Sequence, residues 1–267
     1  MSSPAELREL ACELATLGGS MAADGWRRDI ASGTTRTTMT AATKSSRTDV
    51  VTLHDRAAEA TIVAALTARR PDDGIIGEEG TEREGTSGLS WFLDPIDGTV
   101  NFLYGFPLWS TSVGVADNDG AVAGAVFVPV TGELFAAARG EGATRNSEPI
   151  RASVEVDLSL SLVATGFGYL PSRRSEQATR LTTLIHRVRD IRRGGSAALD
   201  LCYTAAGTVD AYFEDGLNSW DIAAGELIAR EAGCRTGDFA GGPATPAQLL
   251  VAPPALFHEL SALLTGL

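Results

Sequence analysis

The chain has 267 residues, of which 44% are hydrophobic, enough to bury one large core or two modest ones. A formal net charge of −12 argues against nucleic acid as a partner, because the chain has no cationic surplus to displace counterions from a phosphate backbone. Three scattered cysteines without metal-ligand spacing favour a reduced, cytoplasmic compartment, and no apolar run approaches the roughly 20 residues of a membrane span.

The N-terminal third is predicted to alternate helices and short strands. It opens with a polar, acid-bearing stretch, so no signal peptide is expected. Apolar residues recur at helical spacing in two segments, and the second of these stops at Pro71. In chain order we expect a helix over 4–26, a loop or weak hairpin over 32–43, a short strand over 49–52, a helix over 56–70, a strand over 74–77, a loop over 81–88 and a buried strand over 89–93.

Beyond residue 108 the pattern predicts an antiparallel meander and then an alternation of strands and helices. Asp117-Asn118-Asp119-Gly120 is a strong hairpin signal, and the polar stretch 145–157 is expected to mark a change of layer. Strands are expected at 112–116, 121–128, 133–138, 158–165, 191–193, 209–214 and 248–251, and helices at 172–189, 196–206, 220–232 and 254–264. Such alternation implies a sheet covered by helices, and we expect two sub-domains, 1–147 and 148–267, in one compact unit.

The stretch Trp91–Phe102 carries the densest chemical signal. A buried strand ends in Asp94 and Asp97, which are separated by a proline that fixes φ and turns the chain. The two carboxylates can converge on one point, where a cation between them would offset their repulsion. Gly98 and Thr99 follow with backbone N–H groups suited to an anion if a helix or tight turn begins there. A cation beside an anion suggests a metal-held phosphate; the alternative is a strand followed by an ordinary Asp-Gly surface turn.

Further acids stand near the ends of predicted strands, and each has an ordinary structural interpretation. Glu78-Glu79 suits a solvated turn, and Asp221 suits the first turn of a helix. Asp49 or Asp55 could simply cap the next helix. Together with the two aspartates above, they supply enough hard oxygen ligands for two or three Mg²⁺ ions, and the chain has no matching Cys or His cluster for a softer metal.

Taken together, these motifs resemble the inositol monophosphatase family of Mg²⁺-dependent, lithium-sensitive sugar phosphatases. The likeness covers nearly the whole chain, and the motifs around Asp94 and Asp221, in this order and separation, are highly specific. The matching segments are Lys44-Ser45-Ser46, Asp49-Val50-Val51-Thr52, Asp55, Gly77-Glu78-Glu79, Trp91–Phe102, Thr165-Gly166-Phe167, Gly195-Ser196-Ala197-Ala198, Glu214 and Trp220-Asp221. The resemblance implies an α+β fold, a layered αβαβα sandwich of the sugar-phosphatase (inositol monophosphatase or fructose-1,6-bisphosphatase) type, with two or three Mg²⁺ ions per subunit and a homodimeric assembly.

The resemblance also implies a role for each matching residue. The metal ligands would be Glu78, Asp94, the backbone carbonyl of Ile96, Asp97 and Asp221. The catalytic residues would be Thr99, Asp55 and Glu78, with the Thr99 hydroxyl, paired with Asp55, orienting the attacking water. Phosphate and substrate would contact Asp97, Gly98, Thr99, Gly195, Ser196, Ala197 and Glu214. Lys44, Asp49 and Glu79 would lie near the site.

These residues predict hydrolysis of inositol monophosphate to inositol and phosphate by direct attack of a metal-activated water. No Ser or Cys nucleophile is then required, and none of the three histidines, His54, His186 and His258, is an obvious base. Histidinol phosphate, fructose bisphosphate and a nucleotide 3′-phosphate are alternative substrates of the same superfamily. A different alternative is a non-catalytic scaffold that binds a protein or RNA, against which the complete set of matching ligands argues.

Seven arginines between Arg173 and Arg193 are unusual for so acidic a chain. Their ordinary interpretation is a solvated helix face with a following strand. The alternatives are a subunit contact or contacts with a second anionic group on the substrate.

Overall fold

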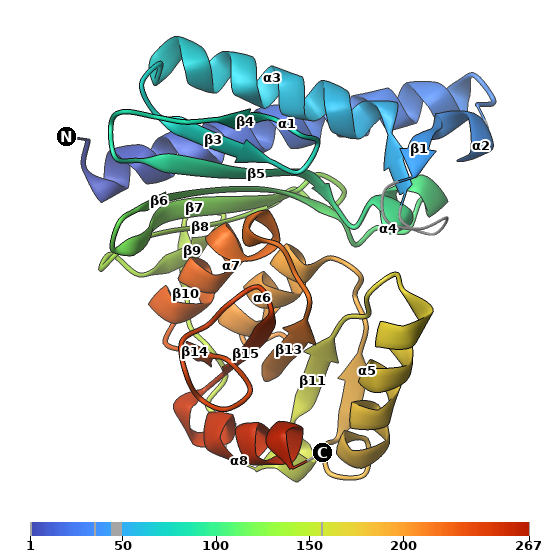
Figure 1. Cartoon of the computed structure of the whole chain (residues 1–267), viewed down its shortest axis with the longest axis vertical. Helices are drawn as coiled ribbons and strands as arrows, with labels where there is room; N and C mark the ends of the chain where they lie inside the picture. The colour runs from blue at the N-terminus through green and yellow to red at the C-terminus, as the bar shows by residue number, and fades with distance from the viewer. Residues whose placement is uncertain (1, 35, 44–49, 156, 267) are drawn as a thin grey trace.

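Five layers of secondary structure make up the molecule, in the order helices, sheet, helices, sheet, helices (Figure 1). The computed structural model describes residues 2–34, 36–43, 50–155 and 157–266. The layered α+β fold expected from the sequence is confirmed. No helix among the described residues is both long and apolar enough to cross a bilayer.

The larger sheet contains eight strands among the described residues, in the order β10-β9-β8-β7-β6-β5-β3-β4. Its pairs are antiparallel except β3 with β5. The strands are β3 (Gly74–Gly77), β4 (Glu82–Arg83), β5 (Ser90–Asp97), β6 (Ser110–Asp117), β7 (Gly120–Val128), β8 (Glu133–Ala138), β9 (Ala143–Arg145) and β10 (Glu148–Ile150). The central strands β5, β6 and β7 are almost wholly buried, which places their ends well inside the molecule.

Helices α1 (Pro4–Ala31) and α3 (Leu53–Arg69) cover the outer face of this sheet (Figure 1). Each begins with a capping box, built by Ser3 and Thr52 respectively, so both N-termini are fixed by side-chain hydrogen bonds. Leucines of α1 pack on Ile62 of α3 and on the sheet. A short helix α2 (Arg36–Met39) precedes an antiparallel strand pair, β1 (Thr40–Thr43) with β2 (Val50–Thr52).

The inner face of the larger sheet is covered by α6 (Ala197–Ala205) and α7 (Ser219–Glu231), which lie between the two sheets (Figure 1). The approach of α7 is close because the sheet presents glycines there. A Cβ at Gly114 would lie 2.7 Å from the Cβ of Ala223, and one at Gly124 would lie 2.7 Å from the Cα of Ala224. These glycines therefore set the depth at which α7 sits on the sheet.

We expect Gly124→Ala to destabilise the protein by about 1–3 kcal/mol, because the added methyl group overlaps the backbone of α7 and cannot rotate away. Thermal or urea unfolding measures the loss. An unchanged midpoint would show that α7 does not pack this closely on the sheet.

The smaller sheet contains five strands in the part of the chain that is described, in the order β12-β11-β13-β15-β14. Its strands are β11 (Leu162–Thr165), β12 (Asp190–Arg192), β13 (Ala211–Asp215), β14 (Arg235–Gly237) and β15 (Gln248–Ala252). Helices α5 (Pro171–Leu184) and α8 (Pro254–Thr265) pack on its outer face, where Leu184 and Phe257 join one apolar cluster. A short helix, α4 (Thr99–Tyr104), follows β5 directly.

Several predicted boundaries are wrong for local reasons. The strand expected over 158–165 begins with a 3-10 turn, η1 (Leu158–Leu160), because Asp157 accepts hydrogen bonds from the amide and hydroxyl of Ser159. The helix expected over 172–189 ends at Leu184. The loop expected over 81–88 contains the two-residue strand β4, which pairs with β3.

The polar stretch 145–157 does not leave the larger sheet at once. Asn146 and Ser147 adopt positive φ, 51° and 68°, which makes a tight turn and returns the chain as β10 beside β9. The hairpin strands are too short and polar to stand out in the sequence pattern. The division into sub-domains at residue 147 stays a prediction.

Candidate active site

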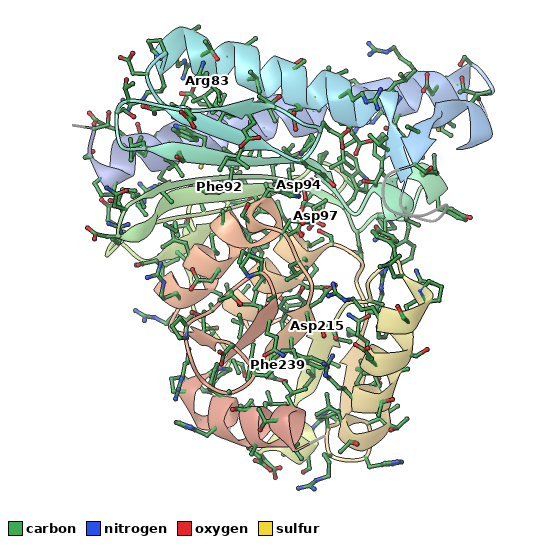
Figure 2. All side chains as sticks on the ribbon, in the orientation of Figure 1. Arg83, Phe92, Asp94, Asp97, Asp215 and Phe239 are labelled. Carbon is green, nitrogen blue, oxygen red and sulfur yellow. The ribbon has the colours of Figure 1, made fainter. Side chains whose placement is uncertain are left out.

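A pocket of about 460 Å³ lies where the end of β5 faces α6, α7 and the loops of the smaller sheet. Figure 2 shows Asp94 and Asp97 side by side at this end of the larger sheet, facing the lower half of the molecule. The pocket is lined by residues from five separate stretches: 78, 94–99, 166–173, 193–200 and 214–221. Glu78, Asp94, Asp97 and Asp221 are all among them.

The two aspartates of β5 share the pocket because the strand is irregular between them. Asp94 pairs with Ser112 and Asp97 with Ser110, so three residues of β6 (110–112) are matched by four of β5 (94–97). Pro95 lies in this bulge, and the N–H of Ile96 donates to Asp94 Oδ1 at 3.1 Å. A regular strand would point residues three apart to opposite faces, and the bulge removes that alternation.

Asp97 is held by the N-terminus of α6. Its Oδ2 accepts hydrogen bonds from the Ser196 hydroxyl at 2.6 Å and from the Ala198 N–H at 2.7 Å. Ser196 is also the N-cap of that helix. The carboxylate is thus placed at the positive end of the helix dipole, which partly offsets the cost of its burial.

Asp55, fully buried at the start of α3, connects that helix to α4. Its Oδ2 accepts from the N–H of Thr52 at 2.7 Å and from the hydroxyl of Thr52 at 2.5 Å. The Thr99 hydroxyl lies 3.2 Å from Asp55 Oδ1 and 3.1 Å from the carbonyl oxygen of Ile96. Because the hydroxyl proton of Thr99 points at these acceptors, the lone pairs of its oxygen are left to accept a hydrogen bond from another molecule.

Gly98, between the bulge and α4, has a backbone conformation that requires glycine. Its φ is +92°, and a Cβ there would lie 3.1 Å from the carbonyl oxygen of Gly195 and 3.2 Å from that of Leu108. Asn101 of α4 donates through Nδ2 to the carbonyl of Gly194 at 2.8 Å. The Gly194–Gly195 turn is therefore fixed against the start of α4.

Glu78 follows β3, and its N–H donates to the carbonyl of Leu93 at 3.0 Å, which sets it beside Asp94. The turn that carries it is clamped by the buried carboxylate of Glu59. Glu59 accepts from the N–H groups of Glu79 at 2.8 Å and Thr81 at 3.1 Å, and from the Thr81 hydroxyl at 2.6 Å. Glu59 of α3 thus positions Glu78, a pocket residue that lies 19 residues further along the chain.

We expect Glu59→Ala to lower the free energy of unfolding by about 2–4 kcal/mol, because it leaves three partly buried donors without their acceptor. It should also weaken any function of Glu78 by loosening the turn. Glu59→Gln, which keeps the shape and one acceptor oxygen, is the matched control and should lose less than half as much. Urea unfolding of both variants measures the difference; equal losses would contradict the clamp.

Like charges crowd the part of the pocket that contains Glu78, Asp94, Asp97 and Asp221. Burial raises the pKa of Asp94 well above its usual value, and the carboxylates of Glu78, Asp97 and Asp221 raise it further. Burial, followed by the Asp97 carboxylate, also raises the pKa of Asp221 well above its usual value. The hydrogen bond that the Asn218 N–H donates to Asp221 Oδ2 at 2.6 Å opposes this shift. The pKa of Asp97 is raised to about 6, chiefly by burial. Acids from three distant segments therefore repel one another across a shared space.

The other end of the pocket holds two further buried acids. Burial raises the pKa of Glu214 to about 7, while the Tyr212 hydroxyl, which donates to it at 2.7 Å, opposes the shift. Burial, followed by the charge of Glu214, raises the pKa of Asp200 well above its usual value. Burial likewise raises the pKa of Asp55 to about 7.

Most of the site residues expected from the sequence line this pocket. Glu78, Asp94, Ile96, Asp97, Gly98, Thr99, Gly195, Ser196, Ala197, Glu214 and Asp221 are in its wall. Asp55 lies behind Thr99, and Glu79 lies outside the wall, where its carboxylate is 3.9 Å from Arg56 Nε. The predictions for Lys44 and Asp49 fall outside the described residues.

The wall also contains polar and aromatic side chains that were given no definite site role from the sequence, among them Tyr169, Arg173, Arg193, Asp200 and Trp220. Asp200 follows Ser196 by one helical turn, a spacing that places both on the same face of α6 and could have indicated it. The two arginines could not be told apart from the others of their segment.

The donor set of the pocket suits a hard divalent cation. Carboxylates and the carbonyl of Ile96 are the oxygen ligands that Mg²⁺ prefers, and no Cys or His occurs in the described wall. The mutual repulsion of Asp94, Asp97 and Asp221 is relieved when a cation lies among them. Within the described ranges no three His, Cys, Asp or Glu side chains already converge as an ion-binding group, and the carboxylates of Asp94, Asp97 and Asp221 accept hydrogen bonds from backbone N–H groups.

Comparison with known proteins decides the family. The model of the inositol monophosphatase family matches residues 3–264. The chain belongs to the inositol monophosphatase family. The family uses divalent metal ions, in keeping with the oxygen-rich wall described above.

Relatives of this family member carry two kinds of name. The chain is 45% identical over 219 residues to an inositol-1-monophosphatase of Mycobacterium leprae, covering 78% of this chain and 75% of that one. It is 46% identical over 202 residues to Nus factor SuhB of Vibrio cholerae, covering 75% and 76%.

Solved structures agree with the family assignment. The extragenic suppressor protein suhB of Bartonella henselae superimposes with a TM-score of 0.90 at 32% identity, over 97% of this chain and 98% of that one. An inositol monophosphatase of Thermotoga maritima gives 0.86 at 30% identity, over 98% and 97%.

Proposed function

We propose that the chain is a Mg²⁺-dependent phosphomonoesterase that hydrolyses inositol monophosphate to inositol and phosphate, with two or three ions per subunit. The observation that carries the proposal is the convergence of Glu78, Asp94, Asp97 and Asp221 on one pocket, next to the Gly98–Thr99 turn. Membership of the family supports the phosphatase class.

The proposed division of labour follows the two ends of the pocket. Glu78, Asp94, Asp97, Asp221 and the carbonyl of Ile96 would hold the ions. Bound divalent ions supply a water of lowered pKa and neutralise the departing ester oxygen. The backbone N–H groups of Gly98 and Thr99 would bind the phosphate, and Gly195, Ser196, Ala197 and Glu214 would line the alcohol part of the substrate.

The Thr99–Asp55 pair is proposed to orient the attacking water. The Thr99 hydroxyl lies within hydrogen-bonding distance of Asp55, so its oxygen can accept a hydrogen bond from water. With a pKa near 7, Asp55 can also take up a proton at neutral pH. Glu78 shares the same end of the pocket and would contribute to activation of the water.

A phosphate-release panel tests the proposal. With Mg²⁺ present, we expect turnover of inositol 1-phosphate to exceed that of histidinol phosphate and a nucleotide 3′-phosphate. If the protein prefers histidinol phosphate a hundredfold, the proposed substrate is wrong and histidinol phosphate takes its place. Failure to release phosphate from any member of the panel would contradict a phosphatase.

The alternative to an enzyme is a non-catalytic scaffold that binds another macromolecule. This alternative is worth testing because several relatives carry the name Nus factor SuhB. The complete set of acids in the pocket favours catalysis for this chain. Survival of the cellular role in an inactive Asp94→Asn variant would show that catalysis is only part of the function. Homodimer formation and a cytoplasmic location stay predictions.

A further inference from the structure

Two arginines, Arg173 and Arg193, belong to the wall of the pocket described above. Arg173 belongs to the first turn of α5, and Arg193 follows β12 directly. Both are exposed, yet both belong to the pocket wall. The pocket wall therefore contains two cations that the acidic composition of the chain does not predict.

Glycines make room for both side chains. A Cβ at Gly216 would lie 1.6 Å from an Nη atom of Arg173, and a Cβ at Gly168 would lie 2.8 Å from its Cδ. A Cβ at Gly195 would lie 2.6 Å from an Nη atom of Arg193. Each guanidinium thus rests on the bare backbone of the pocket wall instead of extending freely into solvent.

Neither guanidinium donates a hydrogen bond or forms an ion pair within 4 Å in the described part of the protein. Most other arginines of the segment do have protein acceptors. Arg180 donates to Asp215 at 2.7 Å, Arg189 to the carbonyl of Leu160 at 2.7 Å, and Arg174 to the carbonyl of Gly168 at 2.8 Å. As far as the described residues go, the donors of these two arginines are left for a ligand.

The acids nearby do not cancel this positive charge. Arg193 lowers the pKa values of Asp200 and Glu214, but burial outweighs it, and both values stay raised. Burial therefore opposes ionisation of these two acids, while the guanidinium groups stay fully charged.

We propose that Arg173 and Arg193 form a subsite for a second anionic group, a phosphate or carboxylate on the alcohol part of the substrate. This inference rests on the proposed phosphatase function, which supplies the first anion-binding end. Guanidinium groups bind such oxyanions through paired, charge-assisted hydrogen bonds. A polyol that carries a second anionic group would then bind more tightly than the corresponding monophosphate.

Matched substrates test the subsite. Inositol 1-phosphate is compared with inositol 1,4-bisphosphate, and fructose 1-phosphate with fructose 1,6-bisphosphate, in wild type, Arg173→Ala, Arg193→Ala and the two corresponding Lys variants. We expect wild type to have the lower KM for each bisphosphate. Each Ala variant should raise that KM roughly tenfold to a hundredfold with little change in kcat, and should leave the monophosphate KM within about threefold. The Lys variants should recover part of the loss.

Arg187→Ala is the matched control, because Arg187 is an exposed arginine of the same segment outside the pocket wall. It should change neither KM. Equal effects of Arg173→Ala and Arg193→Ala on mono- and bisphosphates would overturn the subsite while leaving the phosphatase intact. If wild type hydrolyses nothing, the phosphatase fails, and calorimetric titration with inositol 1,4-bisphosphate decides the subsite: binding lost in both Ala variants supports it, and binding unchanged in them overturns it.

Discussion

Asp94→Asn is expected to reduce phosphate release by roughly a hundredfold or more while increasing the stability of the metal-free protein. Asp94 is 2% exposed and faces the carboxylates of Glu78, Asp97 and Asp221. The amide oxygen of an asparagine can still accept the hydrogen bond from the Ile96 N–H, so the bulge of β5 should persist. Removing one of the repelling charges should stabilise the metal-free fold by about 1–3 kcal/mol.

Asp119→Asn is the control for this substitution, because it removes one negative charge from an exposed hairpin turn far from the pocket wall. It should change neither activity nor stability measurably. Phosphate release and thermal unfolding in EDTA give the two readouts. An Asp94→Asn protein that is inactive and also less stable than wild type would mean that Asp94 has a structural role instead of carrying excess charge.

The stability of the metal-free protein is expected to fall as the pH rises from about 5 to 8. Burial raises the pKa of Asp55 and Glu214 to about 7 and that of Asp97 to about 6. The folded state binds these protons more tightly than the unfolded chain, so their contribution to stability is complete below pH about 4. It is lost as the pH rises through the raised pKa values, and the loss should amount to roughly 3–6 kcal/mol.

Thermal unfolding in EDTA should show this trend as a fall of about 10 °C in Tm between pH 5 and 8. Saturating Mg²⁺ should restore most of the loss at pH 8, because the ion binds the deprotonated carboxylates of the folded state. A Tm that rises with pH in EDTA would show that these carboxyl groups are charged at little cost in the folded protein.

The convergence of the acids on one pocket could be predicted from the sequence because these residues lie in short, dense motifs. Asp94 and Asp97 are three residues apart around a proline, and Asp221 follows a tryptophan at the start of a helix. The hydrogen bonds between Asp97 and α6 could not be predicted from the sequence, because they join residues about 100 positions apart. Only the fold brings the N-terminus of that helix to the end of β5.

The layers of the fold were also predictable, since long apolar segments recur with clear period. Failures came where short polar contacts decide the backbone. The turn at Asn146–Ser147 and the Asp157 cap each involve a few residues with no apolar signature. The different roles of Arg173 and Arg187 depend on the position of the pocket, which no local pattern contains.

Calorimetric titration of Mg²⁺ into protein stripped with EDTA is the most direct test of the claim that these buried acids form a cation site. At pH 6.5, in two buffers of different ionisation enthalpy, we predict saturable binding that releases protons, because ion and proton compete for the same carboxyl groups. Binding should be weakened in Asp94→Asn and unchanged in Asp119→Asn. Absence of saturable binding to wild type, or equal binding to wild type and Asp94→Asn, would contradict the account.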